Sequence, residues 1–306
     1  MQCPTLAELP RPPVDRTGWP WTEETARLPE AMPNRKPWPK ISIVTPLLNQ
    51  KPFIEETIRS ILLQGYPNVE YLIVDGGSTD GSLEVIEAYA PWVRCMVRKG
   101  EGQSAAVNRG FREATGELIG WQNSDDFYGR DSFRNAALAA AANPDCDILH
   151  GMVRGFRGHD SRPPWIFEVC HEFSQERLLE EVCVMNQSMF FRKRIFERGI
   201  FLRDDLHYVM DLELFWRLSL EGFRYQMVPS MTGYYRQHET AKSTQYNVRG
   251  DLEPYAILRD LCRDRRLDRR LRLRARQQLR ARFMSSFSSA RRTLLKKMVP
   301  ELILPV

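Results

Sequence analysis

The sequence predicts an α/β fold with a mostly parallel central sheet that is flanked by helices. From residue 40 onward, short apolar segments rich in β-branched residues alternate with longer segments of helical periodicity. Strands that alternate with helices of this length form right-handed βαβ units, whose parallel strands are covered on both faces. The chain has 306 residues and is 42% hydrophobic, which is enough to bury a large core.

The predicted elements follow one another closely from residue 41 to residue 153. The first strand, residues 41–45, is β-branched, and the helix after it carries Ile54, Ile58 and Ile61 on one face. The apolar strand at residues 118–121 is followed closely by two acidic residues. Further strands are predicted at residues 69–74, 93–97 and 148–153, and helices at residues 52–64, 82–89, 104–114 and 132–143.

Two segments of different composition flank this α/β region. Residues 1–39 hold nine of the 20 prolines together with Trp19, Trp21 and Trp38. Because proline interrupts helices and central strands, we expect this segment to wrap over the domain surface through its tryptophans. The predicted organisation is an N-terminal extension (1–39), a main domain (40–250, with halves 40–128 and 129–250) and a basic amphipathic helical tail (251–306).

The positive charge of the chain belongs to its tail. The net charge is +5, yet residues 259–297 alone hold 15 Lys and Arg against 3 Asp. A nucleic-acid-binding fold would spread basic residues over its reading surface, so we expect no nucleic-acid partner. The tail either packs on its own domain or, as we favour, lies on an anionic membrane surface. Its apolar residues are Leu258, Leu261, Leu271, Leu279, Phe283 and Phe287.

Cysteine spacing and hydropathy indicate the compartment. The six cysteines form no CxxC pair, which argues against a zinc ribbon or a disulfide framework and fits a reducing environment. No apolar run approaches the roughly 20 residues that span a bilayer, and the first residues lack a basic-then-apolar signal. We therefore expect a cytoplasmic protein, either free or peripheral on the inner face of the cell membrane.

Polar side chains follow four of the predicted strands. The carboxyl ends of parallel strands share one edge of a sheet, and ligands of open α/β sheets bind at that edge. Asp125 and Asp126 suit a divalent cation that also contacts substrate phosphates, although such residues are common in turns as well. The residues expected at this edge are Pro46, Asn49, Asp75, Asp80, Glu101, Gln103, Asp125 and Asp126.

The segment VDGGSTDGS, residues 74–82, is predicted to be a strand end, a turn and a helix start. Its glycines permit a tight turn and its serines cap the next helix. Asp75 leaves a buried strand, where its carboxylate can accept the imino hydrogen of a base, so we expect it to recognise the nucleobase. The segment matches neither the GxGxxG fingerprint nor a phosphate-binding lysine loop.

Six segments of the sequence carry a recognisable pattern. They are strand 41–46 ending in TP with Asn49, VDGGSTDGS (74–82), GQSAAVNRG (102–110), GWQNSDD (120–126), MDLELFWRL (210–218) and YYRQHETAKS (234–243). In order and spacing they resemble a family 2 glycosyltransferase. The resemblance implies the GT-A fold, a nucleotide-diphosphate sugar donor, for which we favour UDP, a divalent metal (Mn²⁺ or Mg²⁺) and inversion at the anomeric carbon. It is greatest to enzymes of bacterial surface-polysaccharide assembly, which implies a saccharide or polyprenyl-linked acceptor.

The resemblance also assigns roles around the donor. Asp125 and Asp126 form the DxD-like element, although Asn123 stands where many members have its first acid. The resemblance therefore implies that the metal rests on one of these two carboxylates, either Asp125 or Asp126, with His238 as a further ligand. The nucleotide would contact Thr45, Pro46, Asn49, Asp75, Gln103, Arg109 and Asp125, and the diphosphate would contact Arg236 and Lys242.

Asp211 falls where the family keeps its general base, although Met210 replaces the acid that usually precedes it. A carboxylate there can take the proton of an acceptor hydroxyl as it attacks the sugar; otherwise Asp211 is a helix N-terminal acid favoured by the macrodipole. Asn186 and Gln187 border the acceptor side in the resemblance, or else begin an edge strand with a basic turn.

Three other functions are alternatives to glycosyl transfer. Because Asn123 and Met210 each replace an acid, the main alternative is a catalytically degenerate protein that binds nucleotide sugar without turnover. A sugar-phosphate nucleotidyltransferase would need a glycine-rich, arginine-bearing loop after the first strand, and TPLLNQKPF (45–53) has none. Nucleic-acid binding through the arginine tail would show a steep salt dependence.

Overall fold

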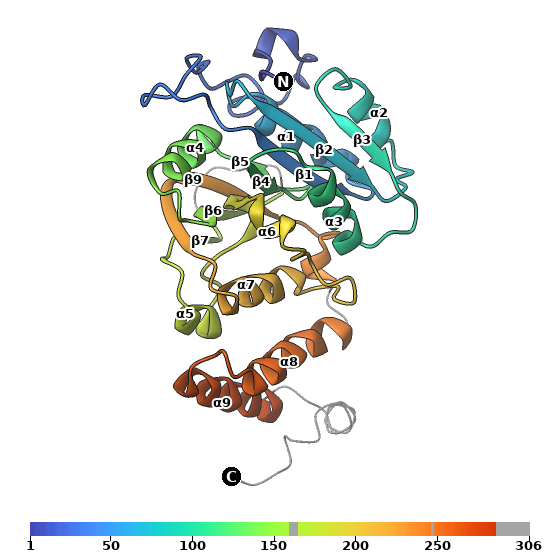
Figure 1. The fold of residues 1–306 in the computed structure, drawn as a ribbon. Helices are drawn as coiled ribbons and strands as arrows, with labels where there is room; N and C mark the ends of the chain where they lie inside the picture. The colour runs from blue at the N-terminus through green and yellow to red at the C-terminus, as the bar shows by residue number, and fades with distance from the viewer. Residues whose placement is uncertain (159–164, 246–247, 286–306) are drawn as a thin grey trace.

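The residues that the structure describes form one twisted sheet of nine strands. The computed structural model describes residues 1–158, 165–245 and 248–285. The strand order is β3-β2-β1-β4-β8-β6-β9-β5, with β7 paired to β6 (Figure 1). The strands are β1 (Ile41–Leu47), β2 (Val69–Asp75), β3 (Arg94–Val97), β4 (Leu118–Trp121), β5 (Phe127–Tyr128), β6 (Ile148–Arg157), β7 (Phe167–Val169), β8 (Met189–Arg192) and β9 (Tyr225–Gln237).

Most strands of the sheet point the same way, as predicted. β1 lies parallel to β2 and β4, β2 to β3, and β6 to β9. β8 is antiparallel to both of its neighbours, β4 and β6, so it reverses within a sheet whose other long strands share one direction. The edge strand considered for the segment after Gln187 is therefore wrong. Met189, Phe190 and Phe191 are fully buried and form a central strand, because both sheet faces and both strand edges are covered there.

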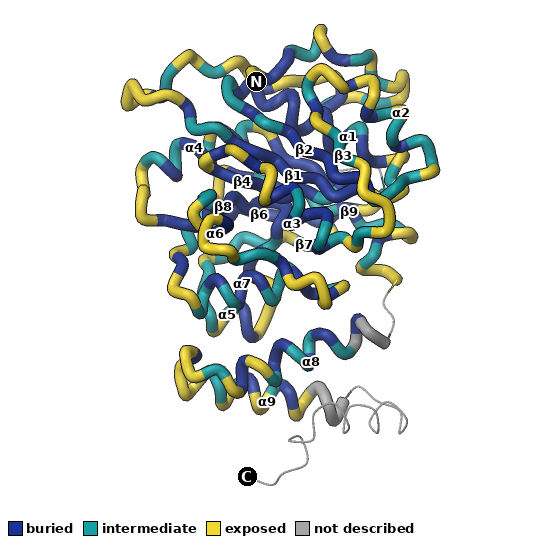
Figure 2. Tube along the Cα trace, turned by 45° about the vertical axis from the view of Figure 1, so that its right-hand side comes forward, coloured by how far each residue is buried: buried dark blue, intermediate teal, exposed yellow. Residues whose placement is uncertain are grey.

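Helices cover both faces of the sheet. Successive strand residues enter two different hydrophobic clusters: Ile43 packs with α1, α2 and α4, whereas Val44 packs with α3 and α7. The sheet forms the buried centre of the molecule (Figure 2). The α-helices are α1 (Lys51–Leu62), α2 (Ser82–Glu87), α3 (Gln103–Glu113), α4 (Ser132–Ala142), α5 (Gln175–Glu180), α6 (Arg194–Glu197), α7 (Met210–Leu220), α8 (Val248–Arg263) and α9 (Arg269–Ser285).

The N-terminal extension lies on the outer side of α1. Arg59 of α1 is fully buried, and its guanidinium donates to the backbone oxygens of Pro10, Pro20 and Trp21 at 2.9, 3.1 and 2.8 Å. The indole of Trp38 is 4% exposed and belongs to the same hydrophobic cluster as α1. The extension therefore wraps the domain through its tryptophans, as expected from its composition.

Helices α8 and α9 form a hairpin that packs below α5 and α7 (Figure 1). Leu258, Leu261, Leu271 and Leu279 are buried in the hydrophobic cluster that includes α7, so these apolar side chains serve the protein's own core. Phe287 lies outside the described residues, and the side chain of Phe283 is not described. Within the described part of the chain, no helix has both the length and the apolar character needed to cross a membrane.

Candidate active site

A cavity of about 930 Å³ opens at the carboxyl ends of the parallel strands. Pro46 of β1, Gly76 after β2, Gln103 after β3 and Asp125 after β4 all line it. The four loops therefore meet at one edge of the sheet, as the alternation of strands and helices predicted. The opposite wall comes from α7, from the segment before β8 and from residues 240–245.

Asp126 is the most buried carboxylate of the site. Its Oδ1 accepts the backbone N–H of Arg236 at 2.8 Å, and its Oδ2 accepts the amides of Gln187 at 2.8 Å and Asn123 at 3.0 Å. Burial raises the pKa of Asp126 to about 8, and the neighbouring charge of Asp125 acts in the same direction. The two carboxylate oxygens of Asp126 thus hold together three segments of the cavity wall, those of Asn123, Gln187 and Arg236.

Asp125 has a different environment from its neighbour. It lines the cavity, and its Oδ2 lies 3.0 Å from Nε2 of His238, whose Nδ1 contacts the hydroxyl of Thr240 at 2.9 Å. A carboxylate oxygen and an imidazole nitrogen at this distance suit Mn²⁺, and the Thr240 contact can orient the ring as metal-bound histidines require. Among the described residues, no group of three or more His, Cys, Asp or Glu could hold a metal ion, so a metal here would need substrate or water ligands.

Arg236 lies beneath the Asp125–Asp126 turn. Its guanidinium forms an ion pair of 2.5 Å with Glu56 and donates to the backbone oxygens of Asp125, at 2.8 Å, and Gly158. The side chain is fully buried, and two phenylalanine rings pack against it. Because all three guanidinium nitrogens bind protein oxygens, Arg236 holds the turn in place, and the diphosphate contact expected of it would require these bonds to break.

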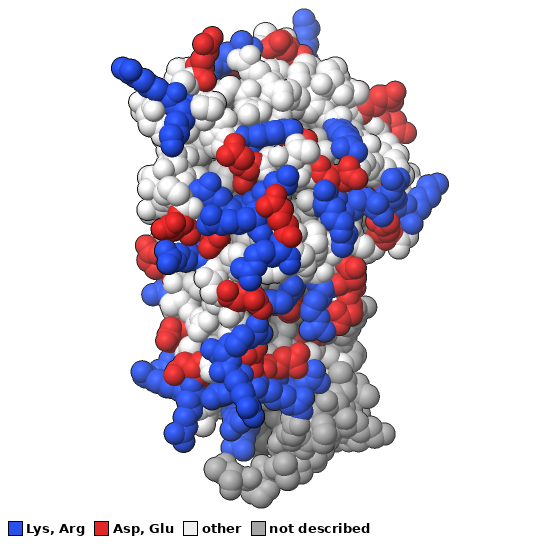
Figure 3. Space-filling view, viewed as in Figure 1, with Lys and Arg blue, Asp and Glu red and all other residues white. Residues whose placement is uncertain are grey.

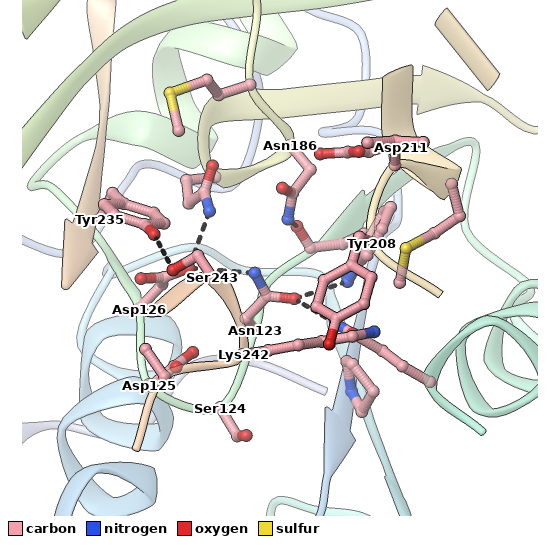
Figure 4. Close-up of a pocket in the computed structure, with 18 of the residues that line it drawn as sticks. Asn123, Ser124, Asp125, Asp126, Asn186, Tyr208, Asp211, Tyr235, Lys242 and Ser243 are labelled. Carbon is pink, nitrogen blue, oxygen red and sulfur yellow. Dashed lines mark hydrogen bonds between the residues drawn. The ribbon is translucent and has the colours of Figure 1, made fainter. Parts of the chain in front are cut away.

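Asn123 connects the two sides of the cavity. Its Oδ1 accepts from Gln103 and from the indole of Trp121, both at 3.1 Å, and its Nδ2 donates to Asp126. Gln103 in turn accepts from the ammonium of Lys242 at 2.8 Å. Lys242 therefore lies over the cavity as the predicted diphosphate contact would require, on a chain of hydrogen bonds that ends at Asp126 (Figure 4).

Asp211 lines the cavity from the first turn of α7, across from Asp125 (Figure 4). It is half-buried, and burial raises the pKa of its carboxyl above the usual range. Its Oδ1 accepts the N–H of Leu212 at 2.8 Å. Met210 is 4% exposed in the core, so the position that precedes Asp211 serves packing here.

Comparison with known proteins decides the family. The model described as "Glycosyl transferase family 2" matches residues 42–200, more than half of the chain. This chain belongs to glycosyl transferase family 2. Relatives include the glycosyltransferase EpsJ of Bacillus subtilis, 26% identical over 65% of this chain and 62% of EpsJ. The O-antigen biosynthesis protein RfbC of Myxococcus xanthus is 31% identical over 52% of this chain and 14% of RfbC. The matches thus cover less than two thirds of either relative.

Solved structures of other glycosyltransferases share the fold. TarS of S. aureus in complex with UDP-GlcNAc superposes with a TM-score of 0.63 and 18% identity, covering 87% of this chain and 76% of that chain. The mannosyltransferase PcManGT of Pyrobaculum calidifontis, in complex with GDP-Man and Mn²⁺, has a TM-score of 0.56 and 18% identity, covering 89% and 85%. The fold is therefore GT-A, as the resemblance implied.

In this family 2 chain, Asn186 and Gln187 reach the cavity just before β8. Both are buried; the amide of Gln187 donates to Asp126, and that of Asn186 lies 3.5 Å from the carbonyl oxygen of Trp121. A Cβ at Gly233 would collide with the backbone of Gln187, so only glycine lets β9 approach this segment so closely. Gln187 is thus tied to the acidic turn, and its acceptor role stays a prediction.

Asp75 lies outside the cavity lining. Its carboxylate is fully buried and accepts the backbone N–H groups of Gly77 at 2.8 Å and Ser78 at 3.0 Å, together with the Ser78 hydroxyl at 2.5 Å. In this structure it closes its own turn, so recognition of a base stays a prediction that requires the turn to open.

Three further residues expected at the nucleotide also lie outside the lining, and each bonds to another group of the protein. Their nucleotide contacts stay predictions. Thr45 accepts from the Tyr71 hydroxyl at 3.2 Å, Asn49 accepts from the Thr79 N–H at 2.9 Å, and Arg109 forms an ion pair of 2.7 Å with Glu101.

Tyr208, which was not among the residues expected at the site, lines the cavity next to Lys242 (Figure 4). Its hydroxyl donates to the backbone oxygen of Gln245 at 3.0 Å, and the Lys242 ammonium lies 5.8 Å from its ring centre. Tyr235 and Ser243 join through their hydroxyls at 2.6 Å. No local pattern marks Tyr208, because its partners lie more than 30 residues away along the chain.

Proposed function

We propose that this protein is an inverting, metal-dependent glycosyltransferase that moves a sugar from a UDP-sugar to a saccharide or lipid-linked saccharide during cell-surface polysaccharide assembly. One observation carries the proposal: Asp125 with His238, and Asp211, stand on opposite sides of one cavity at the carboxyl edge of the sheet. The complex of TarS with UDP-GlcNAc supports a UDP-sugar as the donor, and the similarity to RfbC, an O-antigen biosynthesis protein, supports polysaccharide assembly.

The donor lies in the half of the cavity formed by β1, β2 and α3. Asp125 and His238 would hold Mn²⁺ or Mg²⁺, which supplies positive charge to the diphosphate as it departs. Lys242 adds a second positive charge on the same side, where charge develops in the transition state. Arg236 and Asn123 keep the acidic turn in position from below.

Transfer then needs a base on the other side of the sugar. The carboxylate of Asp211 takes the proton of an acceptor hydroxyl while that oxygen forms a bond to the anomeric carbon. The bond from this carbon to the diphosphate breaks on the opposite face, and its electron pair leaves with the nucleotide. Because the displacement is single, the configuration inverts.

One wall of the acceptor half of the cavity is apolar. Leu178 of α5, Val184 and Met185 line it together with Leu212 and Phe215 of α7. Such a wall beside the base favours an acceptor whose sugar carries an apolar group, as a lipid-linked saccharide does.

The arginines of the hairpin give this end of the molecule a basic surface (Figure 3). Since Leu258, Leu261, Leu271 and Leu279 pack inward and only Leu273 is an exposed leucine among the described residues of the hairpin, contact with the cytoplasmic membrane face would rest mainly on these charges. We expect the protein to sediment with anionic liposomes at low salt and to lose this binding above physiological salt, because salt screens the arginine charges. The exposed arginines are Arg263, Arg265, Arg266, Arg269, Arg270, Arg276 and Arg280.

Calorimetric titration tests the proposal directly. Wild-type protein is titrated with UDP, GDP and dTDP, each with and without Mn²⁺. We expect UDP to bind tightly only with Mn²⁺, and Asp125→Ala to abolish this dependence, whereas the exposed acid Asp145 changed to Ala leaves it intact. Failure of all three nucleotides to bind would contradict the proposal.

Turnover distinguishes a glycosyltransferase from a catalytically degenerate protein that only binds nucleotide sugar. A catalytic protein releases UDP from UDP-GlcNAc, slowly with water and faster with a competent acceptor. If the wild type binds nucleotide but releases UDP no faster than Asp211→Asn does, the protein is a binding protein of the same fold.

A further inference from the structure

The segment that leads into α7 is held at both ends. On one side Asn108 of α3, which is 1% exposed, donates to the backbone oxygen of Leu202 at 2.8 Å and to Asp204 at 2.9 Å. Its own Oδ1 accepts the N–H of Leu202 at 2.8 Å. The start of the segment is thereby fixed to a helix that lines the donor half of the cavity.

At the other end, three successive backbone N–H groups point to one carboxylate. Glu253 of α8 accepts from His207 at 2.7 Å, from Tyr208 at 2.6 Å and from Val209 at 3.2 Å. Glu253 is 6% exposed, so this charge is buried against the turn that begins α7. A buried carboxylate is stable only where donors replace its water, which these three groups do.

The position of this contact links the C-terminal hairpin to the chemistry. Val209 precedes α7, and Asp211 stands two residues farther on, within its first turn. Tyr208, which Glu253 also holds, lines the cavity beside Lys242. A shift of this turn would therefore move Asp211 and Tyr208 together.

We propose that Glu253 is a positioning residue for catalysis: from the C-terminal hairpin it fixes residues 207–209, and through them the general base Asp211 and the cavity wall at Tyr208. This inference rests on the proposed transfer function. It makes α8 part of the catalytic unit, although that helix contributes no described residue to the cavity lining.

Glu253→Gln tests the proposal, because the amide keeps the shape but turns one acceptor into a donor that faces backbone N–H groups. In the full-length protein we expect UDP release from UDP-GlcNAc to fall about 10- to 100-fold, as small misplacements of catalytic groups do. The dissociation constant of UDP with Mn²⁺ should change less than twofold. Asp260→Asn removes an exposed charge from the same helix and serves as the control.

Hydrogen exchange supplies a readout that does not depend on turnover. The amides of His207, Tyr208 and Val209 should exchange faster in Glu253→Gln than in wild type, with no change in the strands β1 and β4. Glu253→Asp, which keeps the charge on a shorter arm, should recover part of both effects, and it stands in if the first variant does not fold.

The outcomes separate this proposal from the one on which it rests. If wild type neither binds UDP nor releases it from UDP-GlcNAc, the transfer function itself is wrong. Unchanged release and unchanged exchange in Glu253→Gln would overturn the positioning role while leaving transfer intact. A uniform loss of folded protein, with normal release per folded molecule, would also overturn it.

Discussion

At position 123 an amide performs a task that a carboxylate could not. The Asn123 amide donates a hydrogen bond to the buried Asp126 and accepts hydrogen bonds from Gln103 and Trp121. An aspartate there would set a second negative charge against Asp126, whose pKa is already raised by burial. The departure from a DxD sequence thus accompanies two different roles: Asp126 anchors the turn, and Asp125 lines the cavity, where we propose that a metal binds.

Asp211→Asn tests the base assignment. The amide cannot accept the hydroxyl proton, so we expect turnover to fall about 10²- to 10⁴-fold while UDP binding is retained. Glu213→Gln, two residues farther along α7 and paired with Arg217 at 2.8 Å, is the matched control and should keep most activity. Equal losses in both variants would argue that the helix, and not the carboxylate, matters.

The pH dependence of transfer should report the same carboxyl. Because burial raises the pKa of Asp211, its basic form is lost on acidification at a higher pH than for an exposed aspartate. We expect kcat/KM for UDP release to fall on the acid side above the usual carboxyl range. An acid limb at or below that of free aspartate would count against Asp211 as the base.

At the scale of elements, one ion pair joins helix α1 to strand β9 under the active site. Arg236 and Glu56 are almost fully buried, and the arginine also donates a hydrogen bond to the backbone oxygen of Asp125. β8 complements this tie from the other side, since Gln187 just before it reaches Asp126. The acidic turn is therefore fixed by three elements that are distant in sequence.

Removing one partner of this pair should be costly. Arg236→Met leaves the Glu56 carboxylate buried and uncompensated, and we expect a loss of about 3–5 kcal/mol in the free energy of unfolding. The double variant Arg236→Met with Glu56→Gln should recover part of the loss, as measured by urea denaturation. Arg94→Met, which breaks an exposed pair with Glu113, should cost about 1 kcal/mol or less. Equal effects of the two single variants would refute a buried tie.

At the scale of the whole molecule, the two terminal segments belong to the fold. The extension before β1 is fastened by Arg59, and the hairpin after residue 248 places its leucines in the cluster around α7. Both segments were recognised as distinct by composition. Composition does not reveal the buried polar groups that help to fasten them, Arg59 for the extension and Glu253 for the hairpin.

The stability of the whole domain should depend on His150 of β6. The ring is 1% exposed, and burial lowers its pKa to about 4, below the unfolded value of 6.5. Between these values the unfolded chain binds a proton that the folded chain does not, so stability is lost as pH falls from 6.5 towards 4. This group contributes up to about 3 kcal/mol to that loss. His150→Phe should flatten the dependence, measured as urea midpoints at several pH values; identical curves would contradict this.

Local pattern determined the order of elements and the edge of the sheet at which the site lies. Apolar periodicity places strands and helices to within a few residues, because each element must bury one side, and parallel strands bring their following loops together. Thus Pro46, Gln103, Asp125 and Asp211 could all be expected at one site from the sequence and its family resemblance.

Tertiary structure alone decided the partners of these residues. Asp126 is buried, whereas Asp125 contacts His238, 113 residues away. Glu253 contacts the turn before Asp211 across 44 residues, and β8 enters the sheet antiparallel to β4. Each of these arrangements depends on contacts between distant segments. Sequence periodicity encodes which face of an element is apolar. It does not encode which distant donor satisfies a buried carboxylate, because that is set by how the packed elements come together.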